Sequence, residues 1–140
     1  MAYFGEYNYT LDSANRIIVP SRFREQLGNE VVFYRAIEGC LYVYDIPGFE
    51  AVIAPLKALS RTDAGREKLR RFYSDVSAVS LDRNGRLVVP AECIEHAGLK
   101  NEVIILGFNS HLEVWDKARY TEALGDKSLA LADEYPDVEF

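Results

Sequence analysis

A ten-residue stretch occurs twice in this chain, and this duplication restricts the fold more than any other feature of the sequence. Residues 11–20 read LDSANRIIVP, and residues 81–90 read LDRNGRLVVP. Each copy begins with Leu-Asp, carries an arginine four residues after the aspartate, and ends in Val-Pro. Because each copy lies between apolar runs, we interpret it as a turn between strands, whose charged side chains face solvent and partners.

The similarity between the two halves continues in the same order after the repeated stretch. Residues 29–32 (NEVV) correspond to 101–104 (NEVI), two residues out of step, and residues 41–45 (LYVYD) then resemble 112–116 (LEVWD). A shared order of matches over about 45 residues indicates duplication of one supersecondary unit.

The spacing of apolar residues predicts the same succession of elements in both halves. Alternating residues predict strands, while Pro and Gly mark where helices begin and end. We expect strands at 3–11, 17–19, 31–35, 41–45, 76–81, 87–89, 103–106 and 112–115, and helices at 20–26, 47–59, 63–73, 91–97 and 118–124. The helix at 47–59 carries an apolar stripe, and the helix at 63–73 can be capped by Thr62 or Asp63 and is expected to turn Tyr73 inward. Each half therefore reads ββαββα. Since a buried three-residue strand cannot complete a sheet by itself, we expect the halves to interlock in one α+β barrel.

Composition fits a folded domain of ordinary size. The 140 residues suit one domain or two small halves that share a core, and a hydrophobic content of 49% argues against disorder. No apolar run approaches the ~18 residues of a membrane span, and the N-terminus does not resemble a signal peptide. Cys40 and Cys93 are each flanked by apolar residues, so we interpret them as buried, reduced thiols of a cytosolic protein.

The charge is unevenly distributed along the chain. A net charge of −6 by itself argues against nucleic acid as a partner. Residues 57–71 nevertheless carry a net charge of +4, and residues 117–140 carry −3. The basic segment 66–71 is interpreted as a solvated helix face, with a phosphate path as the alternative. Arg22 and Arg24 are equally open between phosphate contacts and salt bridges between subunits.

The repeated aspartate and arginine can serve two purposes in a hairpin turn. Asp12 and Asp82 can accept backbone N–H bonds that hold the turn, and each can orient the arginine four residues later. An arginine that is already oriented, such as Arg16 or Arg86, can form a forked contact with guanine or phosphate at a smaller ordering cost. The alternative is an ion pair that only stabilises the turn. A mixed role, with a structural aspartate and a functional arginine, is also open.

Enzyme chemistry finds little support in the residue pattern. His96 and His111 lack metal-ligand spacing to a cysteine or carboxylate cluster, and no glycine-rich loop leads from a strand into a helix. Asp45 and Asp116 occupy equivalent places, which strand ends and helix caps explain better than a catalytic pair. We therefore expect no catalysis, cofactor, metal or small-molecule substrate.

The doubled turn resembles a known family. Two Asp-x-x-x-Arg turns, each followed by an apolar triplet and Pro, resemble the swapped-hairpin DNA-binding module of the SpoVT-AbrB type. Two such modules in a chain of this length resemble the MraZ family of bacterial transcriptional regulators. Residues 106–116 (LGFNSHLEVWD) and 96–99 (HAGL) resemble that family too, so the resemblance covers about residues 3–124.

The resemblance implies an architecture and a set of partners. It implies a double-split β-barrel with peripheral helices, built from a first module (3–47), linking helices (48–73), a second module (74–117) and a C-terminal helix with an acidic tail (118–140). It also implies ring-shaped homo-oligomers in the cytoplasm, associated with the nucleoid. Their partner would be double-stranded DNA with tandem repeat boxes near a cell-division and cell-wall gene cluster, including the protein's own promoter.

The same resemblance assigns DNA contacts to particular residues. It assigns them to Arg16 and Arg86, with Ser13, Asn15 and Arg83 beside them in the turns. The family often has Asp-x-Lys-Gly-Arg in the first turn, where this chain has Ala14 before Asn15. The missing lysine removes a phosphate contact from the first turn, for which Arg83 compensates in the second.

Two rival functions remain open. One is an antitoxin-like or co-regulator protein whose acidic tail, residues 126–140, engages a protein partner. The other is an enzyme of unknown type that uses Asp12 and Asp82.

Overall fold

The computed structural model describes residues 2–124 and 131–139. The expected acidic tail therefore lies partly outside the described residues. The elements follow one another as β1 (Tyr3–Thr10), β2 (Arg16–Ile18), α1 (Ser21–Leu27), β3 (Glu30–Arg35), β4 (Leu41–Asp45), α2 (Ile46–Ile53), the 3-10 helix η1 (Ala54–Arg61), α3 (Asp63–Ser74), β5 (Val76–Ser80), β6 (Arg86–Val88), α4 (Ala91–Ala97), β7 (Glu102–Asn109), β8 (Leu112–Asp116), α5 (Lys117–Leu124) and α6 (Leu131–Glu134). The expected α+β class is confirmed.

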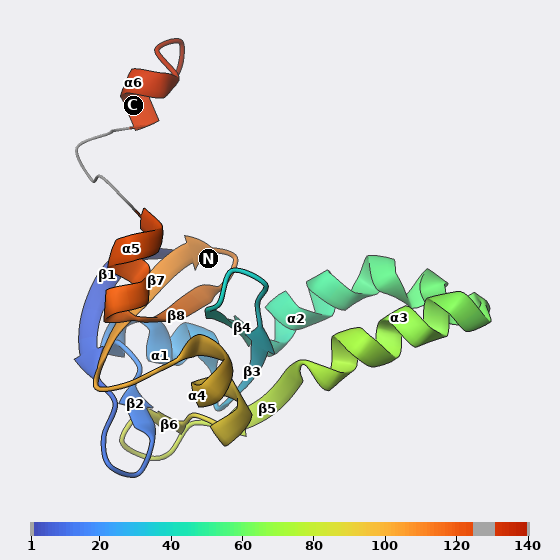
Figure 1. The fold of residues 1–140 in the computed structure, drawn as a ribbon, viewed down its shortest axis with the longest axis horizontal. Helices are drawn as coiled ribbons and strands as arrows, with labels where there is room; N and C mark the ends of the chain where they lie inside the picture. The colour runs from blue at the N-terminus through green and yellow to red at the C-terminus, as the bar shows by residue number, and fades with distance from the viewer. Residues whose placement is uncertain (1, 125–130, 140) are drawn as a thin grey trace.

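Strand pairing joins the two halves at several places. One antiparallel sheet has the order β1-β7-β8-β4-β3-β5, and β2 pairs with β6 in a separate two-stranded ribbon. β1 of the first half pairs along its whole length with β7 of the second, and β5 of the second half pairs with β3 of the first. Figure 1 shows the β2–β6 ribbon at the lower left, beneath the larger sheet. Pairing within the halves is limited to β3 with β4 and β7 with β8, so neither half contains all of its strand partners.

The core lies between the ribbon, the inner face of the sheet, and the helices α1 and α4. The main core cluster takes alternate residues of the sheet strands, because every second side chain of a strand points to the same face. The cluster contains Tyr3, Leu11, Ile17, Val19, Phe23, Leu27, Val31, Phe33, Leu41, Val43, Leu87, Val89, Cys93, Ala97, Leu99, Val103, Ile105, Leu112 and Val114. The short helices α1 and α4 contribute Phe23 and Cys93, which lie at matching positions of the repeat.

The first helix between the halves is shorter than expected. The single helix expected over 47–59 ends at Ile53, and a 3-10 helix continues from Ala54, where Pro55 lacks the N–H that an α-helix requires. Thr62 then begins α3, with its side chain accepting a hydrogen bond from the Gly65 N–H at 3.0 Å, as expected. Together these helices form an arm that projects away from the sheet (Figure 1).

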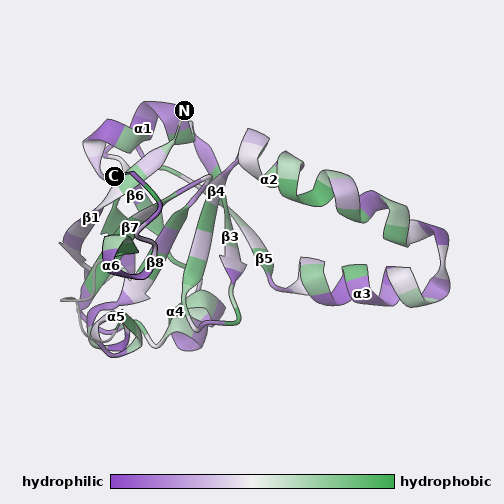
Figure 2. Ribbon diagram, turned by 90° about the horizontal axis from the view of Figure 1, so that it is seen from above, coloured by the Kyte–Doolittle hydropathy of each residue, from purple (hydrophilic) through white to green (hydrophobic). Residues whose placement is uncertain are grey.

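The arm buries less apolar surface than its sequence pattern predicts. Tyr73, expected to face inward, is 44% exposed, and α2 has no buried residue. Figure 2 shows that apolar residues follow the central strands and also α2, although α2 lies outside the sheet. The prediction was wrong here because an apolar stripe indicates a buried face only where another element covers it.

The crossed pairing predicts that neither half folds alone as a monomer. Residues 1–60 contain β1 and β3 without their partners β7 and β5, so both strands would expose unpaired backbone groups. We expect the separately expressed fragments 1–60 and 74–140 to lack a cooperative thermal transition as monomers, and the mixed fragments to regain part of it. Circular dichroism with sedimentation analysis measures both properties. A sharp melt from either monomeric fragment would contradict the interlocked fold.

Candidate nucleic-acid interface

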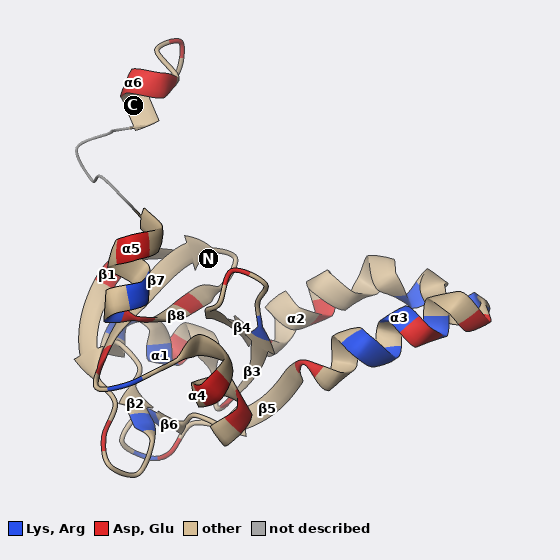
Figure 3. Ribbon diagram, viewed as in Figure 1, with Lys and Arg blue, Asp and Glu red and all other residues tan. Residues whose placement is uncertain are grey.

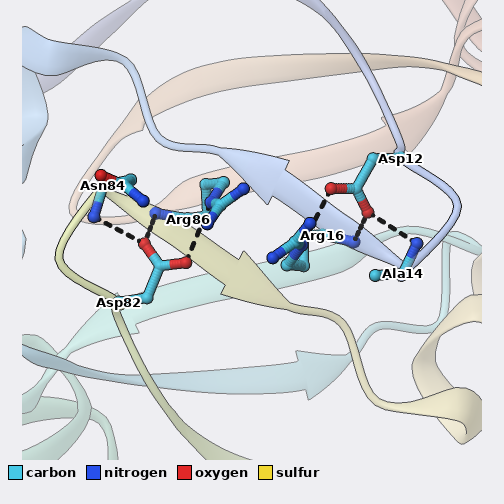
Figure 4. A network of polar contacts seen from close by, with 6 residues as sticks. All are labelled: Asp12, Ala14, Arg16, Asp82, Asn84 and Arg86. Carbon is cyan, nitrogen blue, oxygen red and sulfur yellow. Dashed lines mark hydrogen bonds and ion pairs between the residues drawn. The ribbon is translucent and has the colours of Figure 1, made fainter.

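The two repeated turns have the same hydrogen-bond geometry (Figure 4). In the first, Oδ1 of Asp12 accepts bonds from the backbone N–H groups of Ala14 at 2.9 Å and Arg16 at 2.8 Å, and Oδ2 accepts one from Arg16 Nε at 2.9 Å. Asp82 makes the equivalent bonds in the second turn, including one from Arg86 Nε at 2.9 Å. Each aspartate therefore holds its turn and also orients its arginine, while a functional role for the arginine stays a prediction.

The outer guanidinium nitrogens of Arg16 and Arg86, Nη1 and Nη2, stay available as hydrogen-bond donors. Of the three guanidinium nitrogens, only Nε is bound by the aspartate in each turn. Among the residues that the structure describes, Nη1 and Nη2 of Arg16 and Arg86 have no hydrogen-bond partner. The two side chains are 33% and 28% exposed. Each arginine thus presents two parallel N–H donors from a fixed position, the geometry that suits forked recognition of two acceptors.

The arginines lie on the outer face of the β2–β6 ribbon. Arg16 pairs with Val88, Ile17 with Leu87, and Ile18 with Arg86. Ile17 and Leu87 are each 1% exposed and face the core. Because side chains alternate along a strand, the other two pairs occupy the opposite face, with the two arginines at diagonal corners. Figure 4 shows the arginines on neighbouring strands, with the aspartates to either side of them.

Backbone hydrogen bonds tie each turn to the other half. The N–H of Val19 donates to the carbonyl of Gly85 at 2.9 Å, and the N–H of Val89 donates to the carbonyl of Asn15 at 2.8 Å. Asn15 and Gly85 both have positive φ, 59° and 73°, as their positions in the repeat predict. The two turns therefore form one unit, and neither can move without breaking a bond to the other half.

Arg22 and Arg24 have different surroundings. Arg24 is half-buried, donates from Nε to the carbonyl of Val19 at 3.0 Å, and lies directly against Gly85. Arg24 therefore packs against the second turn and supports it. Arg22 is exposed and donates to the Tyr7 hydroxyl at 2.9 Å. A salt bridge or phosphate contact by either residue stays a prediction.

The remaining predicted site residues separate into two groups. Ser13 and Arg83 are exposed at the tips of the two turns, beside the ribbon. The basic segment of α3 does not lie beside the ribbon. Figure 3 shows its Lys and Arg residues on the projecting arm, away from the ribbon. Two of them form ion pairs on the arm itself, Arg66 with Asp63 and Arg71 with Glu67. The interpretation of this segment as a solvated face agrees with these pairs.

The two paired acidic positions serve as helix caps, as expected. Asp45 Oδ1 accepts from the Gly48 N–H at 2.6 Å at the start of α2, and Asp45 Oδ2 accepts from the Tyr3 hydroxyl at 2.6 Å. Asp116 accepts from the Arg119 N–H at 3.3 Å at the start of α5. Both carboxylates are thus engaged with backbone groups of their own half.

The cysteines and His96 also lie where the sequence indicates. Cys40 and Cys93 are buried free thiols, and burial raises their pKa to about 12 and about 11. His96 lies in the last turn of α4, with its Nε2 2.6 Å from the carbonyl oxygen of Ala36. These groups therefore belong to the packing of the fold and not to the outer face of the ribbon.

One feature of the ribbon was missed from the sequence. The strand at 17–19 was expected to be buried throughout, yet Ile18 is 41% exposed, and Val88 in the second copy is 54% exposed. The period-two rule contained the signal, because a strand that buries Ile17 and Val19 must turn Ile18 outward. The run of three apolar residues concealed it.

Hydrogen bonding lowers the pKa of both turn aspartates. For Asp12 the largest cause is the backbone N–H of Arg16, followed among the lowering causes by its guanidinium. For Asp82 it is the backbone N–H of Arg86. Each bond favours the ionised carboxylate, which keeps the turns in this geometry at pH values above the ordinary carboxyl range.

The chain was also compared with known proteins. The family model described as "MraZ protein, putative antitoxin-like" matches residues 2–72 and again residues 72–134. The chain belongs to the MraZ family. The transcriptional regulator MraZ of Clostridium acetobutylicum is 40% identical over 121 residues, which cover 86% of this chain and 85% of that protein. The MraZ regulator of Moorella thermoacetica is 35% identical over 142 aligned residues, covering 98% and 99%, and that of Deinococcus radiodurans is 39% identical over 122, covering 86% of each.

The double match of the MraZ model confirms the repeat read from the sequence. Its two parts meet at residue 72, between the two copies of the turn. In the part of the chain that the structure describes, no helix is long and apolar enough to cross a bilayer.

The first turn has Asn15 where the second has Gly85. This difference predicts that exchanging the two residues affects the free energy of unfolding unequally. A Cβ at residue 85 would collide with Arg24, and moving that side chain breaks its bond to Val19. We expect Gly85→Asn to lower the free energy of unfolding by about 1–2 kcal/mol, and Asn15→Gly to change it by less than about 1 kcal/mol. Urea denaturation measures both changes. In an Arg24→Ala background the cost of Gly85→Asn should shrink; an unchanged cost would show that the collision is not its cause.

The lowered pKa of the turn aspartates predicts a specific acid sensitivity. Their contribution to stability is complete above the ordinary value of 3.8 and is lost as pH falls through the lower folded-state pKa. In the Asp12→Asn, Asp82→Asn double variant neither side chain can be protonated at low pH, so it has no stabilising carboxylate to lose. Its unfolding free energy should therefore fall less steeply than that of the unmodified chain below about pH 4. Carboxyl carbon NMR titration provides the independent check: midpoints at or above 3.8 would refute the prediction.

Proposed function

We propose that this MraZ-family chain is a sequence-specific regulator of transcription that binds double-stranded DNA with the outer face of the β2–β6 ribbon and its two turns. The observation that carries the proposal is the matched pair of arginines, each fixed by an aspartate through Nε, with neither Nη in a hydrogen bond among the described residues. The relatives named above are transcriptional regulators by name. An ion pair needed only to stabilise a turn would not have to recur at equivalent positions of one exposed ribbon.

The ribbon has dimensions that suit the major groove. Two paired strands lie about 4.8 Å apart, and the major groove of B-DNA is about 12 Å wide and admits a two-stranded ribbon. Arginine donates a forked pair of hydrogen bonds to O6 and N7 of guanine, the commonest specific contact in that groove. Arg16 and Arg86 therefore read base edges in this proposal. Ser13, Asn15 and Arg83 contact the backbone from the turn tips, with Arg22 and Arg24 behind them.

Assembly completes the proposal. A chain with a net charge of −6 and few basic residues at its ribbon binds DNA weakly as a single subunit. Several subunits in a ring present identical ribbons to tandem boxes, and linked binding can raise avidity by about 10²–10⁴. We assign the boxes to the region upstream of a cell-division and cell-wall gene cluster, including the protein's own promoter, and place the protein at the nucleoid in the cytoplasm. The finer fold proposal is a double-split barrel of modules 3–47 and 74–117, with linking helices 48–73 and a terminal segment 118–140.

The family description favours one second candidate function. It calls the family antitoxin-like, and the described part of the tail carries Asp133, Glu134, Asp137 and Glu139, all exposed. In an antitoxin such a segment could engage a basic protein partner. We rank this below transcriptional regulation, because it leaves the two oriented arginines of the ribbon without a purpose. An enzyme that uses Asp12 and Asp82 ranks lower still, because both carboxylates are occupied by their turns.

The proposal predicts which substitutions weaken DNA binding. Arg16→Ala and Arg86→Ala should each cost about 1–3 kcal/mol per occupied box, because each removes a base-edge contact. The loss should be greater on DNA with several boxes than on DNA with one box. Titrations with DNA from upstream of the chain's own gene, at several salt concentrations, measure both effects.

Two controls separate the rival explanations. Arg71→Ala removes an arginine that is 80% exposed on the projecting arm, and should leave binding nearly unchanged. Neutralising the four tail acids should leave DNA binding intact or tighter, whereas an antitoxin would lose its partner. Equal binding by the Arg16→Ala, Arg86→Ala and unmodified chains would refute the proposed function.

A further inference from the structure

The outer face of the ribbon carries two exposed aliphatic side chains between the two arginines. Ile18 is 41% exposed and Val88 is 54% exposed, although both lie in three-residue strands whose other apolar residues are buried. They occupy equivalent positions of the repeat, two residues after Arg16 and Arg86. The core does not require an aliphatic residue at either position, since both face away from it.

The register places each aliphatic residue beside the arginine of the other half. Val88 pairs directly with Arg16, and Ile18 pairs directly with Arg86. Directly paired residues have Cα atoms about 5 Å apart, and residues two apart on one strand are spaced by roughly 6.7 Å, close to two base-pair steps. The outer face is therefore a small square with arginines at one pair of opposite corners and aliphatic residues at the other.

We propose that Ile18 and Val88 are specificity-determining residues that contact the 5-methyl groups of thymines in the major groove. This inference rests on the proposed function. Each arginine and the aliphatic residue paired with it act together as one recognition unit. In the first unit, Arg16 binds a guanine while Val88 contacts a neighbouring thymine. Arg86 and Ile18 form the second unit. The preferred site consequently has a thymine within one or two steps of each recognised guanine.

The chemistry of the groove favours thymine over the other bases. Thymine alone presents a methyl group in the major groove, whereas cytosine presents an N4 amino donor at the same edge. An aliphatic side chain cannot accept that hydrogen bond, so placing it there leaves a polar group unpaired. Isoleucine and valine are branched at Cβ and have few rotamers in a strand, so they hold a fixed surface against a methyl group.

A contact between subunits is the other reading of exposed aliphatic residues. The outer face of the ribbon is better suited to DNA than to a second subunit. Its two aliphatic residues alternate with two guanidinium groups whose Nη donors have no partner among the described residues. A subunit that covered Ile18 and Val88 would also cover these donors and would have to supply acceptors for them.

The test removes single methyl groups from the DNA and leaves the protein unchanged. A duplex selected from a random library by the full-length chain is resynthesised with deoxyuridine in place of each thymine in turn, which deletes only the 5-methyl group. Loss of one buried methyl contact should weaken binding about fourfold. The effect should appear at thymines next to the recognised guanines and nowhere else in the duplex.

Two variants then assign each methyl group to its residue. Val88→Ala should bind the thymine duplex about fourfold more weakly. It should no longer respond to deoxyuridine beside the guanine read by Arg16, and should still respond at the other unit. Ile18→Ala should show the reverse pattern. Tyr73→Ala removes a comparably exposed apolar side chain from the arm and serves as the matched control.

The outcomes separate this inference from the proposed function. Binding that depends on Arg16 and Arg86 but ignores every deoxyuridine substitution would overturn the methyl contacts and leave the proposed function standing. Binding that ignores the arginines as well would overturn both. A change in assembly mass with Ile18→Ala or Val88→Ala, measured by sedimentation, together with an unchanged response to deoxyuridine, would show that the two residues form a subunit interface and would also overturn the inference.

Discussion

The antiparallel pairing of β2 with β6 is the interaction on which the rest of the molecule depends. It brings the two copies of one repeat into contact, with Ile17 and Leu87 facing the core and the arginines facing outward. Two three-residue strands form few backbone bonds by themselves, and an isolated ribbon is marginal in water. The carbonyls of Asn15 and Gly85 extend this pairing, because each accepts a bond from the valine that follows the strand of the other half.

The aspartates convert this structural ribbon into a surface with defined chemistry. A carboxylate that accepts two backbone bonds and one guanidinium bond cannot rotate without breaking the turn, and the guanidinium bound to it is held in one direction. In the proposed interface, the order that recognition requires of each arginine is therefore already present before DNA binds. Rigidity of this kind lowers the entropy lost on binding more than it adds contacts.

Charge has a different role at the ribbon from its role in the whole chain. The net charge of −6 would repel a polyanion, yet the acidic residues of the described tail and the basic residues of the arm lie away from the ribbon (Figure 3). The two aspartates at the ribbon are occupied by hydrogen bonds from their own turns. Local geometry thus matters more than net charge for what this face can bind, because exposed charges are screened within about 8 Å in physiological salt.

The sequence by itself determined the elements and the chemistry of the turns. The repeat, the positive-φ positions at Asn15 and Gly85, and the pairing of Asp12 with Arg16 all follow from local rules, since a turn of five residues contains every atom that fixes it. The helix caps at Thr62 and Asp45 also follow from local sequence.

Only the tertiary structure decided which strands pair and which side chains reach the surface. Crossed pairing of β1 with β7 depends on contacts about a hundred residues apart, and nothing in either strand alone specifies its partner. The exposure of Tyr73 on the arm was hidden for the same reason. An apolar side chain is buried or exposed according to what packs against it, and the packing neighbours come from distant parts of the chain.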